Sequence, residues 1–248
     1  MRRFYIDPSA LKGAHAVIGG TDAKHIRNVL RLKPGDRILL FDGSGLEHKA
    51  RISGLSPGQV EVDIQESGPA MAEPPVHITV AQALLKERKM DQLVRHVTEL
   101  GISRWVPFRT RRSIPRPESG RMTARLQRWE KISREALKQC RRGRAPEIAA
   151  PVGFESVLEM GAAADLKIVF YEGAASEGPW AMTPGGAVKR ILALLGPEGG
   201  FSPSEIEQAR AAGFHIVGLG PRILRAETAT LAACSLLQYL FGDMGPIA

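Results

Sequence analysis

Residues 190–220 have the sequence RILALLGPEGGFSPSEIEQARAAGFHIVGLG, and this stretch decides the fold class. The apolar runs 190–195 and 215–220 have the composition of buried strands. Between them, Ser202-Pro203-Ser204-Glu205 is a capping-box pattern with proline at the first helical position, and Gly213 lies where that helix would end. A strand, a helix and a second strand in succession predict part of a mostly parallel α/β sheet.

The same alternation extends through most of the chain. Further strands are predicted over 76–85, 102–108 and 166–172, and helices after the first two of these, over 90–100 and 123–142. A final helix is predicted from about Glu227 to Leu240. The apolar face of the 123–142 helix is separate from its basic residues, which indicates that one side of it packs on the sheet.

The N-terminal region has a different pattern. Segments 37–41, 46–55 and 59–66 alternate apolar and polar residues and are separated by turn sequences, so they predict a small antiparallel β-barrel or sheet. Asp22 can cap a short helix upstream, which either touches RNA or is purely structural. Because 66–75 has the composition of a linker, we expect two domains, 1–72 and 73–248.

The charge distribution indicates a polyanionic partner. The formal net charge is +8, and fourteen basic residues lie between Arg104 and Arg144 against three acidic ones. Most are arginines, whose planar guanidinium suits phosphate. The alternative is a solvated helix face, although such faces usually mix both signs.

Other classes of protein are excluded by composition. No apolar run approaches the roughly 20 residues that span a bilayer, and Asp7 and Pro8 interrupt the N-terminus before a signal peptide could form, so we expect a cytoplasmic protein that contacts no membrane. The two cysteines, Cys140 and Cys234, are far apart and form no CxxC motif, which predicts neither a disulfide framework nor a metal site.

Two loops at predicted strand ends carry the chemistry. Ligands of open α/β sheets bind at the carboxyl ends of strands. Residues 195–201, LGPEGGF, let backbone approach a ligand closely, and residues 219–229, LGPRILRAETA, mix apolar and polar side chains able to hold a flat ring. Neither loop is a Walker A or GxGxxG motif. The first could also be an ordinary strand-to-helix turn.

Together these motifs resemble those of the RsmE family. LLGPEGGFSPSE and LGPRILRAETATLAA match its C-terminal motifs, and the likeness extends in order through RRFYI, HIRNVLRLKPGD, KERKMDQLVRHVTELG and RWEKISREALKQCRRGRAPEI. The family consists of SPOUT-class enzymes that use S-adenosylmethionine to methylate N3 of a uridine in small-subunit ribosomal RNA. The resemblance implies an N-terminal PUA-like β-barrel, a C-terminal SPOUT-type α/β domain with a trefoil knot, and a homodimer.

The resemblance also implies site residues. The cofactor would be held by Leu195, Gly196, Pro197, Glu198, Gly199, Gly200, Leu219, Gly220, Ile223, Leu224, Arg225, Thr228 and Ala229. We expect catalytic roles for Arg225, stabilising charge on the uracil, and for Glu198, accepting a proton; alternatively, Glu198 caps amides of its own turn. Ala226 stands where the family commonly has threonine, which puts a side-chain role there in doubt.

Basic residues should hold the RNA backbone while the target base is presented. The expected RNA-binding residues are Arg2, Arg3, Arg27, Arg31, Arg111, Arg112, Gln139, Arg141, Arg142 and Arg144. The substrate is either free small-subunit RNA or the assembled subunit. Two other functions stay open at this point: a non-catalytic RNA-binding assembly factor, and a SPOUT methyltransferase that acts on a ribose hydroxyl or another base.

Overall fold

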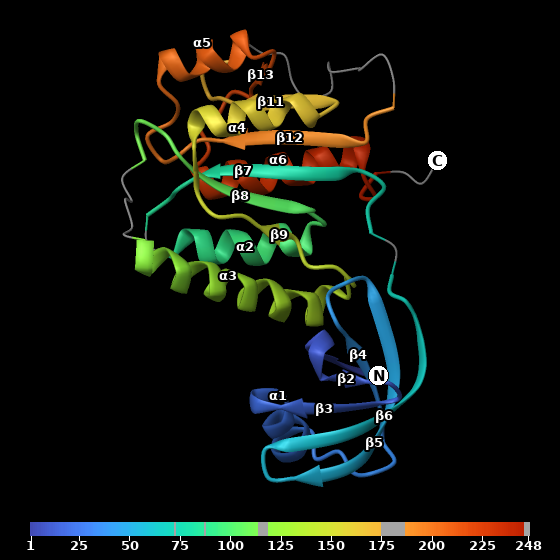
Figure 1. Cartoon of the computed structure of the whole chain (residues 1–248). Coiled ribbons are helices and arrows are strands. Elements are labelled where there is room, and N and C mark those ends of the chain that lie inside the picture. The colour runs from blue at the N-terminus through green and yellow to red at the C-terminus, as the bar shows by residue number, and fades with distance from the viewer. Residues whose placement is uncertain (72, 87, 114–118, 175–186, 246–248) are drawn as a thin grey trace. The chain divides into compact units, whose positions relative to one another are not determined.

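The structure is a computed structural model that describes residues 1–71, 73–86, 88–113, 119–174 and 187–245 of the 248-residue chain. The chain divides into two compact units, shown in Figure 1. The first consists of Met1–Glu73 and Leu137–Ala145, and the second of Pro74–Ala136 and Pro146–Ala248. The expected domain boundary placed Leu137–Ala145 in the second domain, whereas its contacts place it in the first unit.

A six-stranded sheet forms the first unit, in the order β1-β4-β5-β6-β3-β2. As expected, β4, β5 and β6 form an antiparallel meander, while β1 joins β4 in parallel. The strands are β1 (Arg2–Tyr5), β2 (Leu11–Lys12), β3 (His15–Gly19), β4 (Arg37–Phe41), β5 (Leu46–Ser56) and β6 (Gln59–Pro69), with a 3-10 turn at Pro8–Ala10. Alternate residues, among them Ile38, Leu40, Ile52 and Val62, form its core.

The short helix of this unit starts earlier than predicted. Helix α1 (Gly20–Lys24) has Gly19 as its N-cap and continues into the π-helical turn η2 (His25–Val29). Asp22 therefore lies inside the first turn rather than at the cap, and its carboxylate accepts hydrogen bonds from the Lys138 ammonium, 2.9 Å from each oxygen. The helix is held to the segment 137–145 by this ion pair.

A parallel sheet forms the centre of the second unit. Its strand order is β10-β8-β7-β12-β11-β13, with β9 also paired to β8, and every pairing is parallel, as the alternating pattern predicts. The strands are β7 (His77–Ala83), β8 (Arg104–Arg109), β9 (Glu147–Ile148), β10 (Val152–Gly153), β11 (Leu166–Phe170), β12 (Arg190–Leu195) and β13 (His215–Val217).

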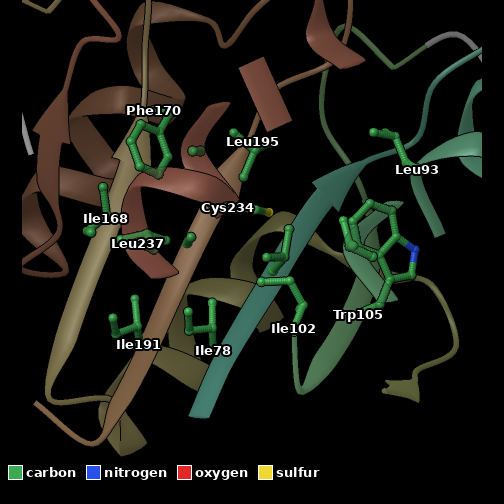
Figure 2. Packing of buried hydrophobic residues seen from close by; sticks show 14 of the residues in the cluster. Ile78, Leu93, Ile102, Trp105, Ile168, Phe170, Ile191, Leu195, Cys234 and Leu237 are labelled. Atoms are coloured by element: carbon green, nitrogen blue, oxygen red, sulfur yellow. The ribbon is translucent and has the colours of Figure 1, made fainter. Parts of the chain in front are cut away.

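Helices cover both faces of this sheet. The helices are α2 (Lys89–Glu99), α3 (Ser119–Cys140), α4 (Phe154–Met160), followed by a 3-10 turn at Gly161–Ala163, α5 (Pro203–Ala211) and α6 (Ala226–Phe241). On one face, residues of α2, α3 and α6 pack with the strands; Figure 2 shows Cys234 and Leu237 of α6 among the strand residues Ile168, Ile191 and Leu195, and Leu93 of α2 on the side of Trp105. On the other face, α4 and α5 pack through a separate cluster. Both faces are apolar, which explains the continuous hydrophobic runs of these strands.

The strand, helix and strand predicted within residues 190–220 are confirmed as β12, α5 and β13. Ser202 caps α5: its hydroxyl accepts from the Glu205 amide while the Glu205 carboxylate accepts from the Ser202 amide. Helix α4 was not predicted, because its seven residues are too few for a clear periodic pattern. Within the described parts of the chain, no helix has both the length and the apolarity needed to cross a bilayer.

Candidate functional site

A cavity of about 370 Å³ lies at the carboxyl ends of β11 and β12 in the second unit. Its walls come from four places: the start of α2, the residues after β11, the loop 195–200 after β12, and the segment 219–229 that leads into α6. Apolar side chains and glycine backbone make up most of it, and Lys89, Glu172, Glu198, Arg222 and Arg225 add charge. Its size and its mixture of apolar walls with few polar groups are typical of a small-molecule site.

A buried glutamine ties the walls of this cavity together. Gln82, at the end of β7, is fully buried. Its side-chain amide donates to the carbonyl of Gly196, at 3.1 Å, and its carbonyl oxygen accepts from the Thr230 hydroxyl of α6, at 2.5 Å. One side chain therefore fixes the first loop and the last helix to the same strand end.

Lys89 makes a second connection at the start of α2. Its ammonium lies 3.2 Å from a carboxylate oxygen of Glu198 and 3.2 Å from one of Glu227. All three side chains are between 27% and 29% exposed, so the ion pairs are partly shielded from water. Glu198 belongs to the first loop and Glu227 to the first turn of α6, so Lys89 joins the two loops electrostatically.

The surroundings of Glu198 favour its ionised form. Burial raises the pKa of this carboxyl, but hydrogen bonds from its own amide and from the Lys86 amide, together with Lys89, outweigh burial and hold the pKa below the ordinary value of 4.5. Burial lowers the pKa of the Lys89 ammonium, but its interactions with the carboxylates of Glu198 and Glu227 outweigh burial and raise this pKa above its ordinary value. A carboxylate with a lowered pKa holds a proton weakly, so the geometry favours a role for Glu198 in shaping its loop.

Glycine is required at one position of the first loop. Gly200 has a φ of +66°, and a Cβ there would lie within 2.4 Å of the Glu172 carboxylate as the structure places it. The positive φ therefore disfavours any other residue, and a side chain here would also force the flexible Glu172 carboxylate to move. The chain brings Glu172 against the first loop in this way. In the described part of the chain, neither a hydrogen bond nor an ion pair engages the Glu172 carboxylate.

Most of the expected cofactor residues line the cavity. They are Leu195, Gly196, Pro197, Glu198, Gly200, Leu219, Gly220, Ile223, Leu224, Arg225 and Ala229. Gly199 and Thr228 are not among the lining residues. The carbonyl of Gly199 instead accepts a hydrogen bond from the Arg112 guanidinium at 2.9 Å, so Gly199 helps to fix the loop.

The sequence did not predict five lining residues, Lys89, Phe170, Tyr171, Glu172 and Arg222, and Ala226, whose side-chain role was in doubt, also lines the cavity. Arg222 and Ala226 lie within the second loop, 219–229, but neither was among the expected cofactor-binding residues. Phe170, Tyr171 and Glu172 end the predicted strand 166–172, so the rule that ligands bind at strand ends could have found them. No rule of this kind predicts that Lys89, the first residue of α2, lines the cavity.

The expected RNA-binding arginines of the second unit lie beside the first loop. Arg112 donates to the carbonyls of Gly199 and Phe201, at 2.9 and 3.4 Å, and the Arg111 amide donates to Glu205. Both arginine residues are exposed. Arg112 thus has a structural task at the cavity, while the side chain of Arg111 remains available to a ligand.

Two arginines of the first unit that were expected to bind RNA, Arg3 and Arg142, have internal partners. The Arg3 guanidinium contacts Glu47 at 2.6 Å and also donates to the carbonyls of Leu137 and Arg142. That of Arg142 contacts Glu73 at 2.6 Å. Each of these two side chains is only 7% exposed. Both were chosen for their charge, but their guanidiniums are engaged inside the fold, where removing a carboxylate partner would leave a buried charge uncompensated.

The remaining expected RNA-binding residues of this unit are exposed: Arg2, Arg27, Arg31, Gln139, Arg141 and Arg144. Arg144 is partly engaged, because its guanidinium donates to the Ser44 carbonyl at 3.0 Å.

Comparison with known proteins identifies relatives of the whole chain. The profile of the RNA methyltransferase domain matches residues 72–238, and that of the RNA methyltransferase PUA domain matches residues 18–65. Ribosomal RNA small subunit methyltransferase E of Bacillus subtilis is 30% identical over 249 aligned residues, covering 96% of each chain. That of Mycobacterium tuberculosis is 30% identical and covers 96% of this chain and 91% of its own.

Solved structures give the same picture. Ribosomal RNA small subunit methyltransferase E of Neisseria gonorrhoeae, bound to S-adenosylmethionine, is 33% identical with a TM-score of 0.86, covering 98% of this chain and 99% of its own. The Legionella pneumophila protein Lpg2936, in complex with the same cofactor, is 31% identical with a TM-score of 0.88, covering 97% and 98%.

We expect Lys89→Met to weaken the binding of S-adenosylmethionine on the order of tenfold, because two partly shielded carboxylates then lose their shared cation and repel each other. Calorimetric titration measures this. Lys86→Met is the matched control, since only its backbone amide contacts Glu198 and its side chain is exposed. Equal affinity in Lys89→Met and wild type would show that the two ion pairs do not hold the cavity.

Proposed function

The chain belongs to the ribosomal RNA small subunit methyltransferase E family, so it methylates small-subunit ribosomal RNA with S-adenosylmethionine, and we propose that the methyl acceptor is N3 of a uridine. The cavity at the strand ends, which both family motifs line, supports methyl transfer from this cofactor, and the family resemblance supports N3 as the acceptor. A protein that only binds RNA has no need of this cavity. The alternative of a non-catalytic assembly factor is therefore dropped.

The residues present fit this cofactor. The cavity volume of about 370 Å³ lies in the range of small-molecule sites, and Phe170, Leu195 and Leu219 offer apolar walls to a flat base. A Cβ at Gly200 would fill part of the space, so glycine keeps the cradle open. When bound, the cofactor supplies an activated methyl group on a positively charged sulfur. The chain's task is to align that group with the acceptor atom and to exclude water.

The acceptor must lose a proton. N3 of uracil carries hydrogen at neutral pH, and after its loss the negative charge is shared with the two exocyclic carbonyl oxygens. Arg225 lines the cavity, is exposed and directly precedes α6, so its guanidinium can reach a base presented from solvent. We propose that Arg225 stabilises the charge on the uracil oxygens, as an oxyanion-stabilising cation.

We assign the proton acceptor to Glu172. Of the two carboxylates that line the cavity, Glu198 is occupied by Lys89 and by the amide of Lys86, whereas Glu172 is exposed. An acceptor must reach the substrate unhindered. This replaces the expectation for Glu198, whose contacts are those of the alternative role as an acceptor of amide hydrogen bonds in its own loop.

Glu172→Gln is expected to lower kcat by about 10²- to 10⁴-fold, with cofactor affinity nearly unchanged. Its rate should recover as pH rises, because hydroxide then removes the N3 proton without help from the side chain. Glu198→Gln should lose cofactor affinity and show no such recovery. The test is to measure methyl-transfer rates of wild type and both variants at test conditions of about pH 7 to 10. A Glu172→Gln enzyme with wild-type kcat would refute the assignment of Glu172 as proton acceptor.

The function itself is tested by mass mapping of modified nucleotides in small-subunit ribosomal RNA. RNA from cells that lack the gene should lack one N3-methylated uridine, and the gene should restore it. A methyl group lost from a ribose hydroxyl or from another base would overturn the choice of acceptor atom.

Incubating free RNA and assembled subunits with the purified protein then identifies the substrate form. Because ribosomal subunits are the target, we propose that the protein acts in the cytoplasm.

We also propose a homodimer and a knotted second unit, on the strength of the family resemblance. Helix α6 supports the dimer, since Tyr239 and Leu240 are 55% and 36% exposed and Leu231, Leu236 and Phe241 are half-buried. Ile223, at the cavity, is 86% exposed. Light scattering should give twice the chain mass of 26.9 kDa; the single-chain mass would refute the dimer. The chain path in a crystal structure tests the knot.

A further inference from the structure

The first unit contains a second, strongly basic cavity. It has a volume of about 300 Å³ and lies among β1, the turn η2 and the end of α3. All of its charged lining residues are basic. The lining consists of Met1, Arg2, Arg3, Phe4, His25, Leu30, Lys138, Gln139 and Arg141. Three segments that are far apart in sequence therefore converge on a positively charged hollow.

Part of this charge is neutralised inside the fold and part is not. Arg3 is paired with Glu47 and Lys138 with Asp22. For Arg2, His25 and Arg141 the described residues supply neither an ion pair nor a side-chain hydrogen bond. These three residues are exposed. The cavity thus keeps uncompensated positive charge that faces solvent.

Arg141 has an unusual backbone conformation. Its φ is +67°, the left-handed region that favours glycine, and its amide donates to the Leu137 carbonyl at 3.1 Å, which closes the last turn of the helix. Glycine is the usual residue at this position after a helix. Glycine occurs two residues later, at Gly143, where an added Cβ would lie within 2.2 Å of Ala70. The chain therefore uses glycine for close packing but keeps arginine at the left-handed position.

The neighbours of Arg141 hold this conformation in place. Arg142 is anchored to Glu73, and the Gly143 carbonyl accepts from the Gly45 amide at 3.1 Å. The other non-glycine residue with positive φ in the described chain is also an arginine, Arg31, which follows Leu30 of the cavity wall. A strained backbone held by fixed neighbours is typical of functional positions. Among the described residues, no side-chain partner is found for Arg141, so its guanidinium is available to a ligand.

We propose that this cavity binds a backbone phosphate of the RNA, with the Arg141 guanidinium as its principal ligand and Arg2 and Gln139 beside it. The guanidinium presents paired N–H donors that match phosphate oxygens, and the Gln139 amide adds a donor on the same rim. That the polyanion is RNA rests on the proposed function. The phosphate positions the RNA and carries no sequence information.

Two variants of Arg141 separate charge from strain. Arg141→Gln removes the charge and keeps a side chain in the left-handed conformation, whereas Arg141→Gly removes both. Arg51→Gln is the control, because Arg51 is an exposed residue of β5 that does not line the cavity. Binding of in-vitro-transcribed small-subunit ribosomal RNA is measured at several salt concentrations, together with Tm and the affinity for S-adenosylmethionine.

Both Arg141 variants should lower the slope of log affinity against log salt by about 0.7 to 0.9, which corresponds to about four- to sixfold weaker binding near 0.15 M salt. Arg141→Gly should also raise Tm by about 1–3 °C, through relief of left-handed strain. Arg51→Gln should leave the slope near that of wild type, and cofactor affinity should be unchanged in all three.

An unchanged slope in both Arg141 variants, or an equal loss in Arg51→Gln, would overturn the proposal, and so would a lower Tm in Arg141→Gly, since the side chain would then stabilise the fold. RNA binding is read directly, so the two proposals fail separately. If wild type methylates RNA while the Arg141 variants bind it normally, only the phosphate site is wrong. If the slopes change as expected but wild type methylates no RNA, only the proposed function is wrong.

Discussion

The cavity depends on one buried side chain, Gln82. Its amide group is fully enclosed at the end of β7 and must satisfy its hydrogen bonds inside the protein, since a buried polar group left unpaired costs about 1–3 kcal/mol. Its nitrogen donates to the carbonyls of Ala83 and Gly196, and its oxygen accepts from the Thr230 hydroxyl. Moving the first loop away from α6 would break hydrogen bonds of Gln82 and would leave buried polar atoms unpaired, at this cost in free energy. The Lys89 ion pairs with Glu198 and Glu227 reinforce the same closure nearer to solvent.

Burial sorts the many arginines into two groups. Arg3 and Arg142 are 7% exposed and carry carboxylate partners, as a charge removed from water must. Arg2 and Arg141 are exposed and have no internal counter-ion in the described chain, so their charge is available to a ligand. The same division holds for the carboxylates at the cavity: Glu198 is paired with Lys89, whereas Glu172 is exposed and has no ion pair with any described residue. Structural and functional charges therefore differ by their partners rather than by their residue types.

Sequence predicts the fold class well because its signals are local. The Ser202 capping box and the apolar runs of β7 and β12 depend on neighbouring residues, and the two loops follow from the rule that ligands bind at strand ends. The contacts of Gln82 and Lys89 could not be predicted, because their partners Gly196 and Glu198 are more than 100 positions away in the chain. The carboxylate partners of Arg3 and Arg142 are 44 and 69 positions away, and counting charge in the sequence cannot tell a paired guanidinium from a free one.

The most direct test of the central claim, that two loops tied together at Gln82 form the cofactor site, is a crystal structure of the protein with S-adenosylmethionine. This arrangement predicts cofactor density between residues 195–200 and 219–229, with the methyl-bearing sulfur on the side of the cavity that Arg225 and Glu172 line. Density at any other place on the chain, or loops that separate when the cofactor binds so that the Gln82 hydrogen bonds are broken, would contradict it.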